Sequence, residues 1–169
     1  MKKLFALWLT LLLCLSLTAC GGNNASFGGT SSGATSSGGE VSFDAIYQGI
    51  LNAQENTDEL IFFPEEGADA IESLYPGLSA LNPRRIQLYL PPVTGYACEI
   101  LLVEVAEGDV DAAKAILQDR IDSGANDTGY PENAVLWQNN AQIQVQGNCL
   151  CLIALPDGYT IPENVFALG

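Results

Sequence analysis

Two stretches of the chain are apolar at consecutive positions, and they constrain the fold more than any other feature. Residues 96–105 and 149–155 place aliphatic side chains on both faces of any strand they form. A strand that is buried on both sides has such a continuous apolar run, whereas a half-buried strand alternates. We therefore expect these two stretches to be the central strands of one sheet.

Two further stretches alternate as half-buried strands do. Ile86 and Leu88 flank Gln87 in residues 86–90, and three glutamines alternate with apolar side chains in residues 142–146. We expect these two strands to flank the central pair. The short apolar run at 60–63 is too brief to assign.

Four segments have apolar residues at helical spacing. Ser42 is a plausible N-cap for the first, and Gly124 is expected to close the third in a left-handed conformation. The expected helices span 41–53, 65–75, 109–123 and 131–139. Together the patterns predict an α+β, two-layer domain with a four-stranded antiparallel sheet in the order 1-2-4-3 and helices packed mainly on one face.

The N-terminus has the layout of a signal peptide. Lys2 and Lys3 precede an apolar segment, 4–17, which is shorter than the roughly 20 residues that a membrane-spanning helix needs. Leu17 stands three positions before Cys20, with small residues between them, and this resembles the lipobox of bacterial lipoproteins. The resemblance implies cleavage after residue 19 and a lipid on Cys20. An uncleaved membrane anchor is the alternative.

The chain therefore divides into a signal peptide (1–19), a lipidated cysteine with a flexible tether (20–40) and a single domain (41–169). The tether is rich in Gly and Ser and has no hydrophobic periodicity, so it cannot offset the entropy of ordering. It fits a spacer from the membrane and a plain linker equally well.

The acidic composition limits the partners. The chain has 20 acidic and 6 basic residues and a net charge of −14. Nucleic acid is not expected as a partner, because its affinity comes mainly from Lys and Arg on phosphate. We expect neutral or cationic ligands, although an acidic surface also serves solubility alone. The basic residues beyond the signal peptide are Arg84, Arg85, Lys114 and Arg120.

The chain has no histidine, which excludes Ser-His-Asp and Cys-His nucleophiles and removes the commonest metal ligand. Cys149 and Cys151 lie in an apolar run and are expected to pack in the core, although a Cys-x-Cys pair could also hold a soft metal. No disulfide is expected, because antiparallel strand order places Cys98 far from both. No cofactor or metal site is predicted.

Arg84 and Arg85 form the only basic cluster of the domain and are candidate contacts for an anionic ligand or a partner carboxylate. The alternative is that they neutralise Glu72 or another nearby acid. Arg120 lies close to the buried stripe of its helix and is expected to extend to solvent or to pair internally. Four aromatic residues belong either to a recognition surface or to the core: Tyr89, Tyr96, Tyr130 and Trp137.

The domain also resembles a known family. The similarity rests on an acidic helix that ends in Leu74-Tyr75, the strand 97–105, the helix end at 117–120, Tyr130, and the strand that follows Gly147. These features resemble the DUF4358-like domain of unknown function, which occurs in bacterial lipoproteins. The resemblance covers roughly residues 42–156 and implies the lipoprotein localisation and the fold, with no activity, cofactor or catalytic residue.

These patterns predict a monomeric lipoprotein, anchored through Cys20 to the outer face of the cytoplasmic membrane. Its domain is expected to be a non-catalytic module that binds an envelope protein or a neutral or cationic ligand. Two alternatives remain open. One is a small hydrolase that uses carboxylates alone, and the other is a solute-binding accessory lipoprotein.

Overall fold

The computed structural model of the chain describes residues 41–55, 60–65, 67–92 and 97–169. The chain divides into Met1–Ser37 and Gly38–Gly169, and all described residues belong to the second unit. The predicted signal peptide and tether lie outside the described residues, as does most of the turn expected at 91–95.

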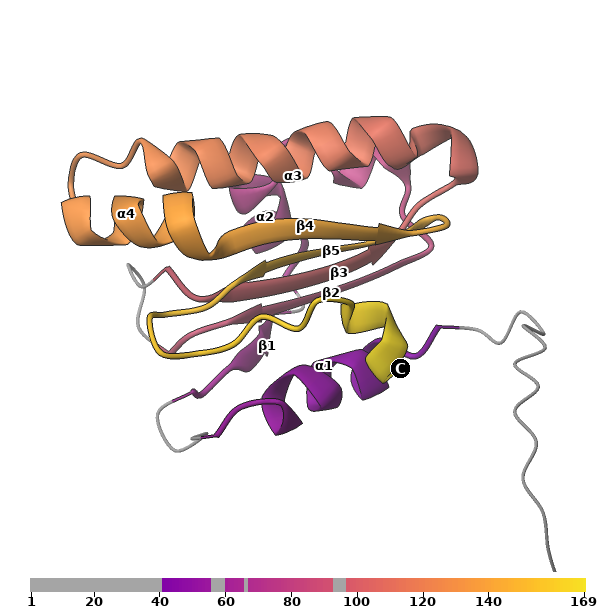
Figure 1. The fold of residues 1–169 in the computed structure, drawn as a ribbon. Helices are drawn as coiled ribbons and strands as arrows, with labels where there is room; N and C mark the ends of the chain where they lie inside the picture. The colour runs from indigo at the N-terminus through magenta and orange to yellow at the C-terminus, as the bar shows by residue number, and fades with distance from the viewer. Residues whose placement is uncertain (1–40, 56–59, 66, 93–96) are drawn as a thin grey trace, which may run out of the picture. The chain divides into compact units, whose positions relative to one another are not determined.

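The described residues form a five-stranded antiparallel sheet in the order β1-β2-β3-β5-β4 (Figure 1). The predicted count of four is wrong, and the order 1-2-4-3 describes only β2, β3, β5 and β4. The additional edge strand, β1, has only three residues, too few to show the alternation of apolar and polar side chains that predicts a strand. The strands are β1 (Phe63–Glu65), β2 (Arg85–Leu90), β3 (Glu99–Glu104), β4 (Ala141–Gln146) and β5 (Cys149–Ala154).

Four α-helices lie within the described residues, near the positions that the spacing predicts. The Ser42 side chain accepts a hydrogen bond of 3.2 Å from the Ala45 N–H, which confirms the predicted N-cap. The second helix begins later than expected, because Glu65 is the last residue of β1. The helices are α1 (Phe43–Asn52), α2 (Ala68–Leu74), α3 (Val110–Ala125) and α4 (Pro131–Asn140). Short 3₁₀ turns are η1 (Ser79–Leu81), η2 (Glu107–Asp109) and η3 (Val165–Leu168).

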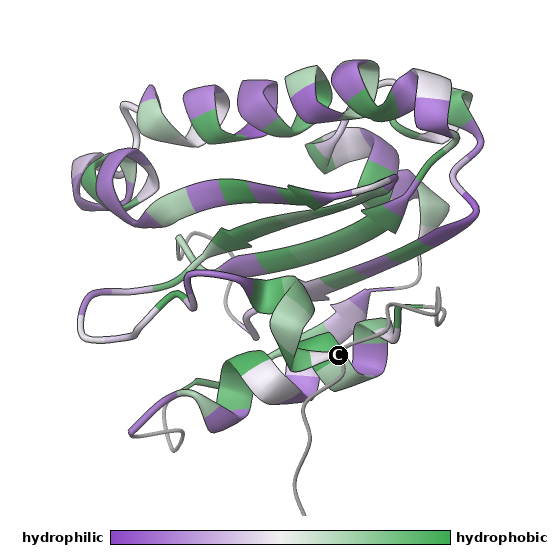
Figure 2. Ribbon diagram, turned by 45° about the vertical axis from the view of Figure 1, so that its right-hand side comes forward, coloured by the Kyte–Doolittle hydropathy of each residue, from purple (hydrophilic) through white to green (hydrophobic). Residues whose placement is uncertain are grey.

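The two central strands are buried along almost their whole length, as their continuous apolar runs predict. All residues of β5 are buried, and Glu104 is the only residue of β3 that is not. Figure 2 shows both strands as a hydrophobic band through the middle of the sheet. Because successive side chains point to opposite faces, each strand contributes to two separate cores.

Both faces of the sheet are covered, so the predicted two-layer arrangement is wrong. The helices α2, α3 and α4 pack on one face, where Tyr75, Leu117 and Trp137 join the core. The helix α1 and the turn η3 cover the other face with side chains such as Ile46 and Phe166 (Figure 1). The physical reason lies in β3 and β5, whose apolar side chains on the second face also need shielding from water.

Two glutamines hold the C-terminal segment against this second layer. The Gln54 side chain donates to the Thr160 carbonyl at 2.9 Å and accepts from the Thr160 N–H at 2.9 Å. Gln144 of β4 similarly donates to the Pro162 carbonyl and accepts from the Val165 N–H, each at 2.8 Å. These paired bonds satisfy backbone groups that have no strand partner, so the segment lies in place without being part of the sheet.

Gly124 has a different role from the predicted one. It lies inside α3, and the described glycines with positive φ are Gly77, Gly147 and Gly158. A Cβ at residue 124 would lie 2.4 Å from Cγ of Trp137 in α4. The glycine therefore lets the indole ring pack directly against the α3 backbone.

We predict that Gly124→Ala destabilises the fold. The added methyl group must displace a buried ring, and overpacking of this kind costs about 1–3 kcal/mol, less the roughly 1 kcal/mol that Ala gains in a helix. Urea denaturation of the purified chain measures the difference. Gly108→Ala is the matched control, because a Cβ there meets nothing within 4 Å. Equal stabilities of the two variants would contradict the packing role.

Candidate functional site

A buried ion pair joins the sheet to the helices on one of its faces. Glu99, the first residue of β3, is only 2% exposed. Its carboxylate accepts two hydrogen bonds from Arg120 of α3, from Nη2 at 2.6 Å and from Nε at 3.3 Å. The hydroxyl of Tyr75, at the end of α2, donates a third to Glu99 Oε1. The carboxylate is therefore bound on both oxygens.

Burial and charge set the ionisation of this cluster. Burial, reinforced by the Glu99 charge, raises the pKa of Tyr75 well above its ordinary value, so Tyr75 remains a neutral donor. Burial alone would lower the pKa of Arg120, but the Glu99 carboxylate raises it above the usual value. The guanidinium also lies over the Trp137 ring at 4.6 Å. The cluster is therefore a fixed cross-link between α2, β3, α3 and α4.

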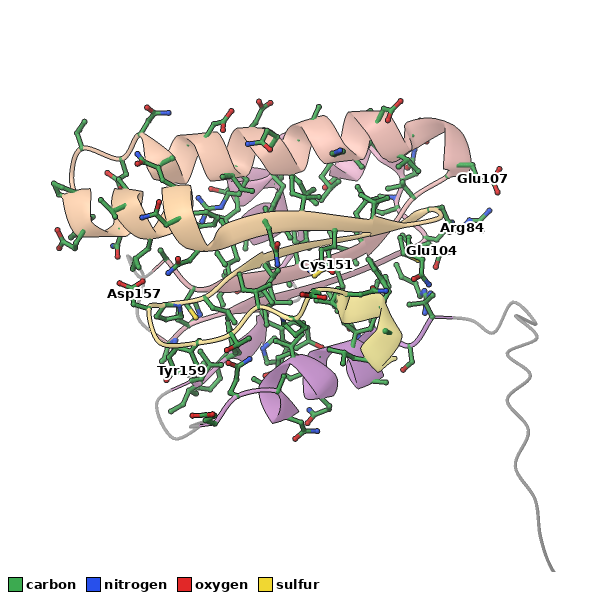
Figure 3. All side chains as sticks on the ribbon, viewed as in Figure 1. Arg84, Glu104, Glu107, Cys151, Asp157 and Tyr159 are labelled. Carbon is green, nitrogen blue, oxygen red and sulfur yellow. The ribbon has the colours of Figure 1, made fainter. Side chains whose placement is uncertain are left out.

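Arg84 and Arg85 also meet a carboxylate, Glu104 at the end of β3. Arg85 Nη2 lies 2.7 Å from Glu104 Oε2, and Arg84 Nη1 lies 3.4 Å from Oε1. Figure 3 shows Arg84 and Glu104 together at one end of the sheet. Arg85 also donates to the Val41 carbonyl and lies over the Phe43 ring.

The acid that neutralises Arg84 and Arg85, which the sequence could not identify, is therefore Glu104. Glu72 instead accepts a hydrogen bond from the Gly77 N–H at 2.9 Å. The hydrogen bond from Arg85 is the main cause that lowers the pKa of Glu104. A ligand contact at Arg84 or Arg85 stays a prediction.

A cavity of about 640 Å³ lies beside the outer edge of β2. We refer to it as the edge groove, and its lining residues come from α1, β1, α2 and β2: Asp44, Tyr47, Gln48, Pro64, Glu65, Ile71, Ile86, Gln87, Leu88 and Tyr89. Its volume is in the range of about 300–1,000 Å³ that is usual for ligand sites.

A stacked aromatic pair and a short hydrogen-bonded chain shape the edge groove. The rings of Tyr47 and Tyr89 are 3.9 Å apart and nearly parallel. The Tyr89 hydroxyl donates to Gln87 Oε1 at 3.2 Å, and Gln87 Nε2 donates to Asp44 Oδ1 at 3.1 Å. Burial, with a smaller effect of the Asp44 charge, raises the pKa of Tyr89 to about 12. The groove thus presents an ordered, uncharged tyrosine next to a carboxylate.

A second cavity of about 400 Å³ lies where α3 meets α4 and has a mostly polar lining that includes Arg120, Asn126 and Asn133. Its one basic group already binds Glu99. The edge groove is the better candidate site, because it combines apolar walls, a carboxylate and a strand edge.

The predicted aromatic and cysteine residues divide between core and surface. Tyr89 and Trp137 are buried, Tyr130 is exposed, and Tyr96 lies outside the described residues. The described cysteines are free and buried. The register pairs Glu104 with Cys149 and Glu99 with Ala154, so Cys98 and Cys149 lie toward opposite ends of neighbouring strands, as predicted.

Within residues 41–55, 60–65, 67–92 and 97–169, no cluster of three or more His, Cys, Asp or Glu side chains could hold a metal ion. None of the helices in that part of the chain is long and apolar enough to cross a membrane.

The comparison with known families identifies the domain. The profile of a domain of unknown function, DUF4358, matches residues 67–155, which is more than half of the chain. The chain therefore belongs to the DUF4358 family. Searches of curated proteins and of solved structures found no match.

We predict that Glu99→Gln destabilises the fold far more than Glu104→Gln does. The first change leaves the buried Arg120 guanidinium without a counter-charge, which costs about 3–5 kcal/mol. The second affects a pair whose arginines are 67% and 31% exposed, and such pairs contribute about 1 kcal/mol or less. Urea denaturation of both variants at pH 7 makes the comparison, and equal losses would refute the structural role of Glu99.

We also predict that stability falls in alkaline solution. The pKa of Tyr75 is raised on folding, so above its ordinary value of 10.0 the unfolded chain loses a proton that the folded chain keeps. That difference lowers the free energy of unfolding by at most about 1.4 kcal/mol per pH unit for this group. Tyr75→Phe should flatten the decline between pH 10 and 11, whereas Tyr130→Phe, which changes an exposed ring, should not. Identical slopes in both variants would contradict the assignment.

Proposed function

We propose that the chain is a membrane-tethered extracytoplasmic lipoprotein whose domain, residues 41–169, is a small non-catalytic binding module. In this proposal Cys20 carries the lipid, and the edge groove binds a neutral or cationic ligand or a segment of an envelope protein. The anchor holds the domain at the outer face of the cytoplasmic membrane. The domain acts as a monomer and needs no cofactor.

The edge groove is the observation that carries the binding role. It lies between α1 and α2, and a stacked tyrosine pair and the Asp44–Gln87 hydrogen bond hold its walls in place. A site that is largely formed before the ligand arrives loses less conformational entropy on binding. The carboxylates of Asp44 and Glu65, in a chain with 20 acidic residues, favour a neutral or positively charged ligand.

The chemistry of the inner carboxylates supports a non-catalytic role. An acid–base mechanism that uses carboxylates alone needs one group with a raised pKa. Both oxygens of Glu99 accept bonds from Arg120 or Tyr75, and the pKa of Glu104 is lowered. These carboxylates therefore function as structural partners of arginine.

The localisation rests on the lipobox at 17–20, which follows a short apolar segment. Cells that express the chain are grown with a fatty-acid analogue, and the chain is then isolated and assayed for label. We expect label on the wild-type chain and none on Cys20→Ala. Equal labelling of the two would remove the membrane-tether part of the proposal.

The binding role is tested in the same cells with a photocrosslinking amino acid placed at Gln48, which lines the edge groove. The matched position is Lys114, an exposed residue of α3, on the opposite face of the sheet from α1. We expect a discrete crosslinked product from position 48 that is missing from position 114. If neither position gives the crosslinked product, or if both give it in equal amounts, the groove is not the binding site.

A further inference from the structure

The edge groove lies where a continuation of β1 would run. The strand β1 pairs only with Leu88–Leu90, so the first half of β2, residues 85–87, has no strand beside it on that side within the described part of the chain. A smaller cavity of about 270 Å³ shares Asp44, Ile86 and Gln87 with the groove and extends it toward Arg85. The uncovered half of β2 spans about 10 Å, the length of three extended residues.

The backbone of β2 at Ile86 faces this space. The Val105 N–H donates to the carbonyl of Asn148, the residue before β5, so the backbone groups of Val105 point toward β5. Backbone groups of successive residues in a strand point to opposite sides, so those of Leu102 and Glu104 point toward β2. Their register partners, Gln87 and Arg85, point back toward β3. The N–H and C=O of Ile86 therefore point away from β3, into the groove.

The position of Pro64 agrees with this alternation. Pro64 has no N–H, and it lies opposite Tyr89, whose backbone groups point toward β3. The β1 residues on either side of Pro64 pair with Leu88 and Leu90, which have the same parity as Ile86. An added strand in line with β1 could therefore form main-chain hydrogen bonds with Ile86 in the way that β1 pairs with Leu88 and Leu90.

The walls of the groove fit an extended chain with a basic side chain. The helix α1 contributes Asp44 and Tyr47 on one side, and α2 contributes Ile71 on the other. Glu65 closes the end next to β1, and none of the ten described lining residues of the groove is basic. Arg85, at the far end, lies 2.7 Å from the Glu104 carboxylate, which offsets its charge. A second copy of this chain, with its net charge of −14, is a poor occupant.

We propose that the edge groove binds an extended peptide segment carrying Lys or Arg, which adds to the sheet in line with β1 and forms main-chain hydrogen bonds with Ile86. This inference rests on the proposed binding role of the groove and specifies its ligand. Main-chain bonds to a strand edge supply affinity in such complexes, and side-chain contacts supply specificity. Here Asp44 and Glu65 select a positively charged side chain.

The test uses the ¹⁵N-labelled full chain in dodecyl maltoside micelles, titrated with blocked pentapeptides and observed by NMR. The probe is acetyl-Thr-Lys-Val-Lys-Thr-amide. Controls are the same peptide with Glu in place of Lys, and the Lys peptide with its central amide nitrogen methylated. We expect the Lys peptide to shift the Ile86 amide signal in a saturable way, the methylated peptide to bind about fivefold more weakly, and the Glu peptide to give no shift.

Two pairs of variants locate the contact. Asp44→Asn should weaken the Lys peptide about threefold, whereas Asp119→Asn, on an exposed position of α3, should not. Ile86→Pro removes the N–H that faces the groove at a position where an edge strand tolerates proline, and it should abolish binding. Ile86→Val keeps the N–H and should preserve binding. Thermal unfolding of each variant confirms that it is folded.

The outcomes separate this inference from the proposed function. No shift of the Ile86 amide with the Lys peptide, or equal binding of the Lys and Glu peptides, overturns the peptide assignment. If crosslinking at Gln48 still gives its product in that case, the groove binds another ligand and the proposed function stands. Binding that survives in Ile86→Pro, with the fold intact, also overturns strand addition.

Discussion

The arrangement of the helices over the sheet depends on one buried carboxylate. Glu99 lies at the start of a central strand, and it binds Arg120 from α3 and Tyr75 from the end of α2. A guanidinium buried without a counter-charge would be strongly unfavourable, so the position of Arg120 over Trp137 depends on its ion pair with Glu99. The cluster therefore ties α3 and the end of α2 to the start of β3 through directional bonds that apolar contacts alone would not supply.

The parts of the fold that could be predicted are those with a long, uninterrupted pattern. The continuous runs in β3 and β5 predict central strands, and the stripe of α3 predicts its buried face and the unusual position of Arg120. The strand β1 could not be predicted, because it has three residues and includes Pro64. The second layer has no sequence signal because η3 is a four-residue turn. It is held by a bond from the Val165 N–H to Gln144, and the segment before it by bonds between Thr160 and Gln54.

The candidate site was predictable only in part. Arg84 and Arg85 stand out in an acidic domain, but their partner Glu104 is about 20 positions away and is set by strand register. The edge groove has no sequence signal of its own. It exists because β1 ends opposite Leu88 while β2 continues to Arg85, with a helix on each side. The position of such a groove depends on where strands and helices end in the folded structure, which no local sequence pattern encodes.

The placement of α1 has a mechanical consequence. The family match spans 67–155, so α1 and η3, which together cover the second face of the sheet, lie outside it. Tension applied through the chain before Val41 reaches α1 before any strand. Its links to the rest of the domain include apolar contacts, the Gln54 bonds and the Asp44–Gln87 bond. A pull on the N-terminus would therefore load these contacts first, and displacement of α1 would remove one wall of the edge groove.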